Sequence, residues 1–384
     1  MKTLYLHIGT PKTGTSALQY FCAGNRKILE EKGIYYPDLG FRFPDIGKHR
    51  NAHFLSYKEY INKKEKLRDH EVERKIREEG IQKLEEAFQT HDTILLSDEH
   101  IWNEKEMTEE TLPALQQRFK EQDVQIKIIV YLRRQDQVIQ SFWAQKIKES
   151  STITFDNYMK KEKYRHFRLD YAARLQEFAD IVGMDNLIVR CYEKQQYLGE
   201  QKTIMSDFLH ILGLEITEEY KNSEKVYNIS LEGTYLEIKR LFNTLPQFKK
   251  QKNYMVDLLK EQQAIDYEKH VLERKKMYFT PEAEKEFMQK FEEENQTVAK
   301  KYLNREDGKL FFENYLDEIQ GGNTGTDYTS KELVQICGNM LSRLNEKYEE
   351  VLQENKELKK GQKGNKQGRS FMERVKRKLT LFFV

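Results

Sequence analysis

Cysteine, proline and tryptophan are scarce in this chain, whose 384 residues include 3, 6 and 2 of them. Cys22, Cys191 and Cys337 lie far apart and form no Cys-x-x-Cys pair, which argues against a disulfide framework and against a zinc site. No stretch approaches the ~18 consecutive apolar residues of a membrane helix. The N-terminal apolar run, residues 4–8, is too short for the core of a signal peptide. These features predict a cytoplasmic protein with reduced thiols.

Charge of one sign is not in excess, since 65 Lys+Arg stand against 63 Asp+Glu and the formal net charge is +2. The distribution is uneven, however. Residues 359–384 hold nine Lys or Arg and one acid, Glu373, so this tail carries +8 and the rest of the chain about −6. A fold that binds polyanions usually spreads its basic residues over its surface, and we therefore expect no nucleic-acid partner for the body.

Short apolar runs alternate with amphipathic helical stretches over roughly the first 220 residues. The runs read as strands covered on both faces, because most lack strict alternation of apolar and polar residues. They are residues 4–8, 93–97, 126–132 and 187–191. A helix after the first strand is expected to stop at Gly33. This order predicts an α/β fold, a three-layer, P-loop-like parallel sheet flanked by helices.

The remainder of the chain is expected to be helical. Charged helical patterns fill residues 231–242, 254–264 and 281–302, and no convincing strand occurs in 230–318. We therefore assign the chain to four parts: residues 1–319 an α/β domain with helical additions, 320–330 a linker, 331–360 a coiled-coil helix, and 361–384 a basic tail with an apolar end.

The helix after the linker carries an apolar stripe at alternating spacings of three and four residues. Its members are Val334, Cys337, Leu341, Leu344, Tyr348, Val351, Asn355 and Leu358. Two interpretations stay open: a helix docked on the body, or a parallel coiled coil that makes the protein a homodimer. Asn355 falls at an a position of the heptad, where a buried polar pair favours an in-register dimer.

The segment 9–16, Gly-Thr-Pro-Lys-Thr-Gly-Thr-Ser, connects the first strand to a helix. A Gly-containing turn in this place presents backbone N–H groups and the positive end of the helix dipole, so we expect it to bind phosphate or a similar anion. A nucleotide hydrolase would have the pattern Gly-x-x-x-x-Gly-Lys-Ser/Thr, with lysine where Thr15 stands. The lysine here is Lys12, earlier in the loop, which argues against that class.

A second anion site is expected after the strand 126–132. Arg133 follows this strand, and Ser141 comes eight residues later in a predicted helix. An arginine at the carboxyl end of a parallel strand can converge with the start of the next helix, and the pair could clamp a second phosphate. The alternative is that both are ordinary surface residues. Two anion sites beside one sheet suggest a ligand with two separated phosphate-like groups.

These motifs resemble the sulfotransferase superfamily that uses 3′-phosphoadenosine 5′-phosphosulfate (PAPS). The resemblance is greatest to bacterial polysaccharide sulfotransferase-like proteins that open with His-Ile-Gly-x-x-Lys-Thr-Gly-Thr and continue with Leu-Gln, and it covers roughly residues 3–215. It implies that the first loop binds the 5′-phosphosulfate and that an arginine and a serine bind the 3′-phosphate. The residues concerned are Lys12, Thr13, Gly14, Thr15 and Ser16 in the loop, then Arg133 and Ser141. It implies no metal, and the family's late donor-binding loop matches no residue after 215.

The acceptor hydroxyl needs a general base that faces the sulfur. The cluster 97–100, Ser-Asp-Glu-His, follows the strand 93–97 and is the best-placed candidate. Related sulfotransferases use a glutamate or a histidine for this step, so Glu99 is the first candidate and His100 the second. His49 and His53 are rivals that could instead bind the acceptor. Lys12 is expected to stabilise charge on the leaving oxygen.

The sequence therefore predicts an enzyme that moves the sulfuryl group of PAPS to an acceptor hydroxyl, on a carbohydrate or cell-surface polysaccharide by family analogy. The alternatives are sulfation of a small metabolite or lipid, a P-loop-type small-molecule kinase, and a non-catalytic coiled-coil scaffold. The position of Lys12 disfavours the kinase, and the joint presence of Lys12, Arg133 and Ser141 disfavours the scaffold. The basic tail is either a solubilising segment or a peripheral contact with the inner face of an anionic membrane.

Overall fold

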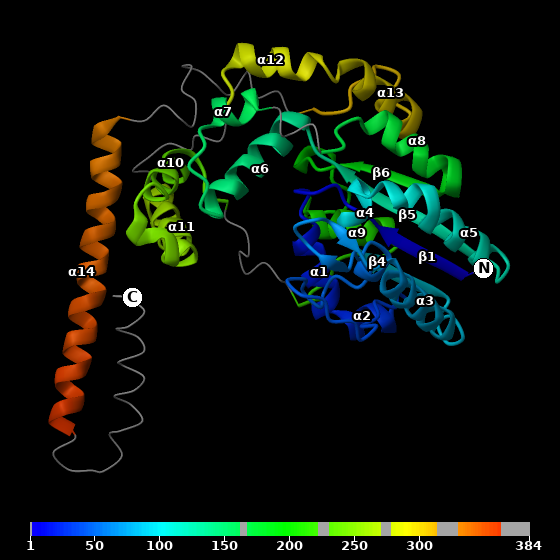
Figure 1. The fold of residues 1–384 in the computed structure, drawn as a ribbon, viewed down its shortest axis with the longest axis horizontal. Helices are drawn as coiled ribbons and strands as arrows, with labels where there is room; N and C mark the ends of the chain where they lie inside the picture. Colours follow the sequence, from blue (N-terminus) through cyan, green and yellow to red (C-terminus); the bar gives the residue numbers. More distant parts are fainter. Residues whose placement is uncertain (1, 162–166, 222–229, 270–277, 313–328, 362–384) are drawn as a thin grey trace. The chain divides into compact units, whose positions relative to one another are not determined.

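The computed structural model describes residues 2–161, 167–221, 230–269, 278–312 and 329–361 (Figure 1). They group into two compact units. Unit 1 comprises residues 1–141, 162–228 and 281–320, and unit 2 comprises residues 142–161, 229–280 and 321–384. All the candidate site residues lie in unit 1. Most of the predicted linker and nearly all of the basic tail lie outside the described residues, and the four-part division stays a prediction.

A parallel sheet forms the centre of unit 1. Its strands are β1 (Lys2–His7), β4 (Thr93–Ser97), β5 (Val124–Leu132) and β6 (Leu187–Cys191), in the order β4-β1-β5-β6. Each neighbouring pair runs parallel, and Leu6 pairs with both Leu96 and Ile128. All four predicted strands are confirmed. The hairpin of β2 (Tyr60–Asn62) and β3 (Leu67–Arg68) was not predicted, because its strands are too short to show a period.

Helices cover both faces of this sheet. On one face lie α1 (Thr15–Gly24), α2 (Arg26–Glu31) and α9 (Ile204–Ile211), where Phe21 and Leu209 pack with Ile129 and Tyr131 of β5. On the other lie α5 (Leu112–Lys120) and α8 (Tyr171–Val182), both of which contact β5. Helix α3 (His70–Ala87) joins this second layer through the ion pair between Glu85 and Arg118. The predicted three-layer α/β fold is confirmed.

Unit 1 contains further helical elements. They are α4 (His100–Asn103), the single turns His53–Leu55, Met184–Asn186 and Lys194–Gln196, the π-turn Met107–Thr111, α12 (Pro281–Gln289) and α13 (Glu292–Leu303). Helix α13 contacts α8 and β6. The helical pattern predicted over 281–302 is thus divided into two helices.

Unit 2 is helical in its described residues. It contains α7 (Phe155–Lys160), α10 (Gly233–Phe242), the turn Pro246–Gln251, α11 (Lys252–Glu268) and α14 (Ser330–Gly361), and α10, α11 and α14 contact one another. Helix α6 (Gln135–Lys148) begins in unit 1 and ends in unit 2. Among the described helices, none is long and apolar enough to cross a bilayer.

Candidate active site

The loop between β1 and α1 is built for close backbone approach. Gly9 and Gly14 have φ values of 54° and 73°, in the left-handed region that favours glycine. A Cβ on Gly9 would lie 2.4 Å from Cγ2 of Thr15, so no larger residue fits there without a shift. Lys12 also has a positive φ, 73°, which is uncommon for a residue with a side chain. These three residues together curl the loop in front of α1.

Hydrogen bonds hold this loop against β5. Ile8 N–H donates to the Ile129 carbonyl at 3.0 Å, and both N–H and hydroxyl of Thr10 donate to the Tyr131 carbonyl at 3.2 and 2.9 Å. Among the described residues, no side chain caps the first turn of α1, where Gly14 is the N-cap residue. Backbone N–H groups at a helix start without a side-chain cap can bind an anion.

Arg133, at the end of β5, is part of the same structure. Its guanidinium donates to the backbone carbonyl of Lys12 at 2.8 Å and to Gln137 Oε1 at 3.0 Å. It also lies 5.5 Å from the ring centre of Tyr192, which follows β6. A Cβ on Gly14 would lie 3.0 Å from that same Tyr192 ring. The arginine, the loop and the residue after β6 thus lie together at one end of the sheet.

Ser141 is not shown to join them. Ser141 lies half-buried in the middle of α6, and no described hydrogen bond links it to Arg133. Its role at a second anion site stays a prediction.

Glu99 lies against the loop from the other side. A Cβ on Gly9 would be 3.3 Å from Cβ of Glu99. The Glu99 carboxylate accepts a hydrogen bond from Gln19 Nε2 at 2.9 Å and pairs with Arg50 at 3.3 Å. Gln19 also donates to Ser97 Oγ at 3.2 Å. The candidate base therefore sits beside the candidate anion loop with its carboxylate held by two side chains.

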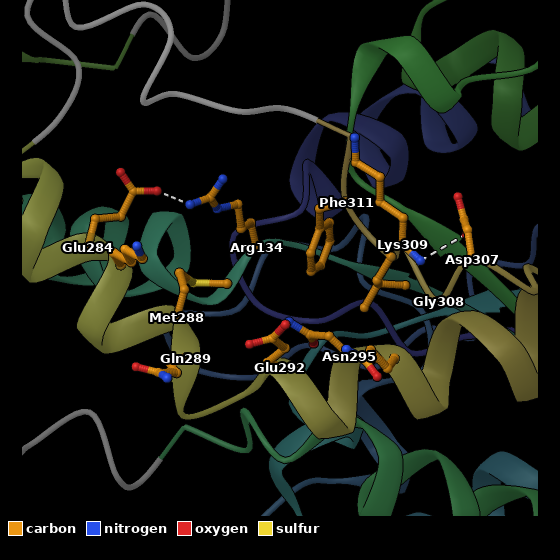
Figure 2. A pocket seen from close by; sticks show the side chains of 13 residues that line it. Arg134, Glu284, Met288, Gln289, Glu292, Asn295, Asp307, Gly308, Lys309 and Phe311 are labelled. Carbon is orange, nitrogen blue, oxygen red and sulfur yellow. Dashed lines mark hydrogen bonds and ion pairs between the residues drawn. The ribbon is translucent and has the colours of Figure 1, made fainter.

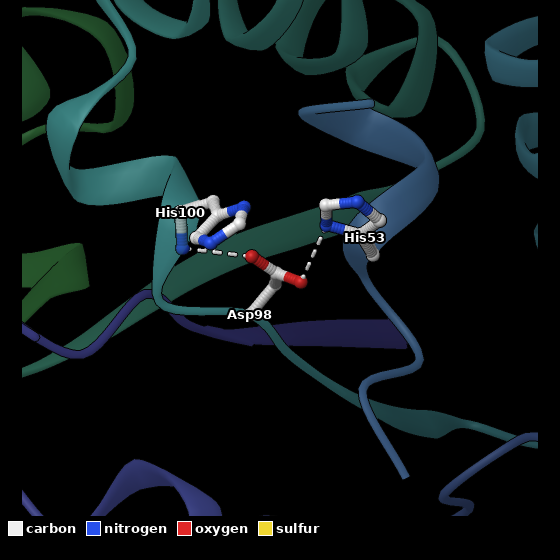
Figure 3. Close-up of side chains that lie close together, drawn as sticks. All are labelled: His53, Asp98 and His100. Atoms are coloured by element: carbon white, nitrogen blue, oxygen red, sulfur yellow. Dashed lines mark hydrogen bonds and ion pairs between the residues drawn. The ribbon is translucent and has the colours of Figure 1, made fainter. Parts of the chain in front are cut away.

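Asp98 directly follows β4 and fixes the end of this strand. It is fully buried, and its carboxylate accepts three hydrogen bonds from Arg50 at 2.9, 2.9 and 3.1 Å. It also accepts one from the His53 ring at 3.1 Å and one from the backbone N–H of His100 at 2.7 Å (Figure 3). Burial raises its pKa, but the hydrogen bond from His53 and the charge of Arg50 outweigh burial and bring the pKa to about 2. Asp98 is therefore a permanent anion that orients Arg50 and His53.

The histidines near this carboxylate differ in exposure. His100 is exposed and His53 is buried, and their rings lie edge to face at 5.2 Å. Although His100 as a whole is exposed, desolvation of its ring lowers its pKa, with Asp98 opposing, so the ring is neutral near neutral pH. His49 stacks on Tyr20 at 3.8 Å, and burial lowers its pKa as well. Glu99, His100 and His53 all remain candidates for the base by position.

One atom each of His53, Asp98 and His100 come within 4.8 Å of one another, a spacing that a metal ion could bridge. Both oxygens of Asp98 already accept hydrogen bonds from the Arg50 guanidinium. A cation here would have to displace a positively charged partner from a buried carboxylate, so the donor set does not fit a metal as folded.

The residues after Arg133 face a different partner. Arg134 pairs with Asp136 and with the buried Glu284 of α12, and Gln135 exchanges amide hydrogen bonds with Asn295 of α13 at 2.7 and 3.2 Å. They anchor α12 and α13 at the start of α6. Arg134, Glu284 and Asn295 also line a pocket of about 560 Å³ whose other wall is the segment after α13, including the ring of Phe311 (Figure 2).

Several residues that support the candidate site were not predicted from the sequence. Arg50 lies in an irregular polar stretch with no periodicity to mark it, 48 residues from the carboxylate that it binds. The contact of segment 305–312 with the end of β6 was not predicted either. There the Phe312 N–H donates to the Glu193 carboxylate, and Cys191 Sγ donates to the Leu310 carbonyl. Gln19 belongs to the Leu-Gln pair of the opening motif, and that pair was the one available signal.

No model of a known protein family matches the chain. An uncharacterised protein of Archaeoglobus fulgidus is 29% identical over 182 residues, 46% of this chain and 46% of that protein, so the chain spans less than half of that relative's length. The solved structure of a sulfotransferase from Alicyclobacillus acidocaldarius is 16% identical, and the match covers 67% of this chain and 95% of that chain, with a TM-score of 0.32. A sulfotransferase domain from the curacin biosynthetic pathway is 14% identical, and the match covers 60% of this chain and 81% of that chain, also with a TM-score of 0.32.

The chain is similar to solved sulfotransferases. Because the TM-scores are low, we infer the function from the residues of the site and not from these likenesses.

Proposed function

We propose that this protein is a sulfotransferase that moves the sulfuryl group of PAPS to an acceptor hydroxyl. The observation that carries the proposal is that three features lie together. The loop that contains Lys12 leads into a helix without a described side-chain cap, Arg133 donates a hydrogen bond to that loop, and Glu99 lies against Gly9 of the loop. An anion site and a base candidate thus face one small region. A kinase loop would have its lysine after Gly14, where Thr15 stands.

The chain's residues would divide the work as follows. Loop N–H groups and Lys12 hold the phosphosulfate and stabilise charge on the bridging oxygen as its bond to sulfur breaks. Glu99, held by Gln19 and Arg50, takes the proton of the acceptor hydroxyl as the new sulfur–oxygen bond forms. The products are the sulfate ester and 3′,5′-ADP. Holding the acceptor hydroxyl in line with the sulfur–oxygen bond that breaks lowers the barrier further, relative to the reaction in water.

We assign the nucleoside end of the donor to the pocket of Figure 2. Arg134 lines it and directly follows Arg133 in the chain, while Phe311 offers an aromatic face for a base. Phe311→Ala should then weaken 3′,5′-ADP more than it weakens inorganic pyrophosphate. Equal losses for both ligands would place the nucleoside elsewhere.

The acceptor class is proposed as a carbohydrate hydroxyl. The family analogy motivates this choice, and the half-buried rings of Phe43 and Tyr57, which lie 4.5 Å apart beside His53, provide aromatic surface of the kind on which sugars stack. A small metabolite or lipid acceptor is the alternative within the same reaction.

Transfer of radioactive sulfate from labelled PAPS to a panel of polysaccharides, glycolipids and small alcohols tests the proposal. Lys12→Ala should slow transfer to every acceptor ~10²–10³-fold, as loss of an oxyanion donor does. Lys27→Ala is the matched control, because Lys27 is an exposed residue of α2 outside the loop. Transfer that survives Lys12→Ala, or none above background with any acceptor, would overturn the proposal.

A further inference from the structure

Helix α14 is fixed to α11 by one of its faces. Ile336 and Met340 are buried there. Asn339 Nδ2 donates to Asp266 Oδ1 at 3.2 Å, and Arg343 donates to the Leu258 carbonyl at 3.1 Å. Both partners belong to α11, so this face of α14 is already covered within the chain.

A second apolar face of α14 is uncovered. Val334, Leu341 and Tyr348, seven residues apart, are 72%, 67% and 40% exposed. At 100° per residue, this row lies about a third of a turn around the helix from Ile336 and Met340. Docking on α11 therefore leaves the row accessible.

The uncovered row supplies the a positions of the heptad seam. Val334, Leu341 and Tyr348 occupy a positions, and the half-buried Cys337, Leu344 and Val351 occupy the d positions between them. The sequence left a docked helix and a coiled coil as alternatives. The a positions stay exposed when α14 docks on α11, while the d positions are half-buried. A docked helix and a coiled coil that pairs through the exposed a row can therefore hold at once.

We propose that this seam binds the same seam of a second copy of the chain, as a parallel, in-register coiled coil. A seam with a strict seven-residue repeat is complementary to itself, which is the condition for a two-fold homodimer. Asn355 continues the a positions, and an asparagine there is satisfied by the identical residue of a parallel partner and by no apolar one. The dimer does not depend on the proposed reaction.

The mass of the full-length protein in solution, measured by light scattering, tests the dimer. Leu341→Lys and Tyr348→Lys should each give a monomer, since both residues lie on the exposed seam and neither holds α14 to α11. Gln335→Lys is the matched control, because Gln335 is an exposed residue of the same helix away from both faces, and it should stay dimeric. A monomeric or trimeric mass for the unmodified protein, or a dimer that survives both seam variants, would overturn the proposal.

Native Cys337 tests the orientation. Cys22 and Cys191 are buried, and Cys337 at a d position would face its own copy across a parallel seam. Mild oxidation should give a covalent dimer that Cys337→Ser abolishes. An antiparallel arrangement would hold the two Cys337 thiols apart, so a light-scattering dimer that oxidation does not cross-link would refute the parallel register.

Discussion

Asp98→Asn is the substitution that most directly tests how the end of β4 is held. Asp98 is fully buried and its pKa is about 2, against 3.8 for an ordinary aspartate. A difference of about two units corresponds to ~2–3 kcal/mol of stability near neutral pH. Asparagine would also leave the Arg50 side chain, 10% exposed, with Glu99 as its remaining carboxylate. Removal of one partner of a buried ion pair costs ~3–5 kcal/mol of stability. Because Arg50 would still pair with Glu99, we expect Asp98→Asn to cost ~2–4 kcal/mol.

The loss should depend on pH with a defined sign. A carboxyl whose pKa is depressed by folding contributes stability above its unfolded pKa, and this contribution disappears as pH falls through the folded value. The difference in unfolding free energy between wild type and Asp98→Asn should therefore be full near neutral pH and shrink between about pH 4 and pH 2.

Urea denaturation followed by circular dichroism measures this difference. Asp92→Asn is the matched control, because Asp92 is exposed in the turn before β4. A loss below ~1 kcal/mol near neutral pH, or a difference that does not change as pH falls, would refute the role assigned to Asp98.

Glu99→Gln should leave affinity for 3′,5′-ADP nearly intact and lower turnover ~10²–10⁴-fold, as loss of a base does; unchanged turnover would move the base to His100 or His53, and their alanine variants in the same assay would decide between them. Arg133→Ala should weaken 3′,5′-ADP more than 5′-AMP in calorimetry, so that the preference shrinks, and an unchanged ratio would remove Arg133 from the 3′-phosphate site. Full-length protein should sediment with anionic vesicles at low salt, and a version ending after Leu358 should not, since nearby cations each contribute ~1 kcal/mol; full-length protein left in the supernatant would contradict a membrane role for the tail.

The central sheet could be predicted because its strands are local apolar runs. Residues 93–97 and 187–191 match β4 and β6, and the loop 9–16 is marked by its glycines and by its place between strand and helix. Signals of this kind are contained within a few neighbouring residues.

The support of the site could not be predicted, because it comes from pairs distant in sequence. Asn51 illustrates the reason: its side chain donates to the Leu95 carbonyl and accepts from Ser97 N–H, replacing a neighbouring strand at the edge of β4. A polar residue in an irregular segment has no period that reveals such a contact. Arg50 is hidden for the same reason, although it orients both Asp98 and Glu99.

The most direct test of the central claim is calorimetric titration of the full-length protein with 3′,5′-ADP, 5′-AMP and ATP with magnesium. Two anion sites predict that 3′,5′-ADP binds more tightly than 5′-AMP, by ~10–10²-fold, because a charge-assisted hydrogen bond contributes ~1.5–3 kcal/mol. ATP with magnesium should bind weakly, since Thr15 stands where a kinase loop has its lysine. Tight binding of ATP with magnesium and none of 3′,5′-ADP would contradict the assignment as a sulfotransferase.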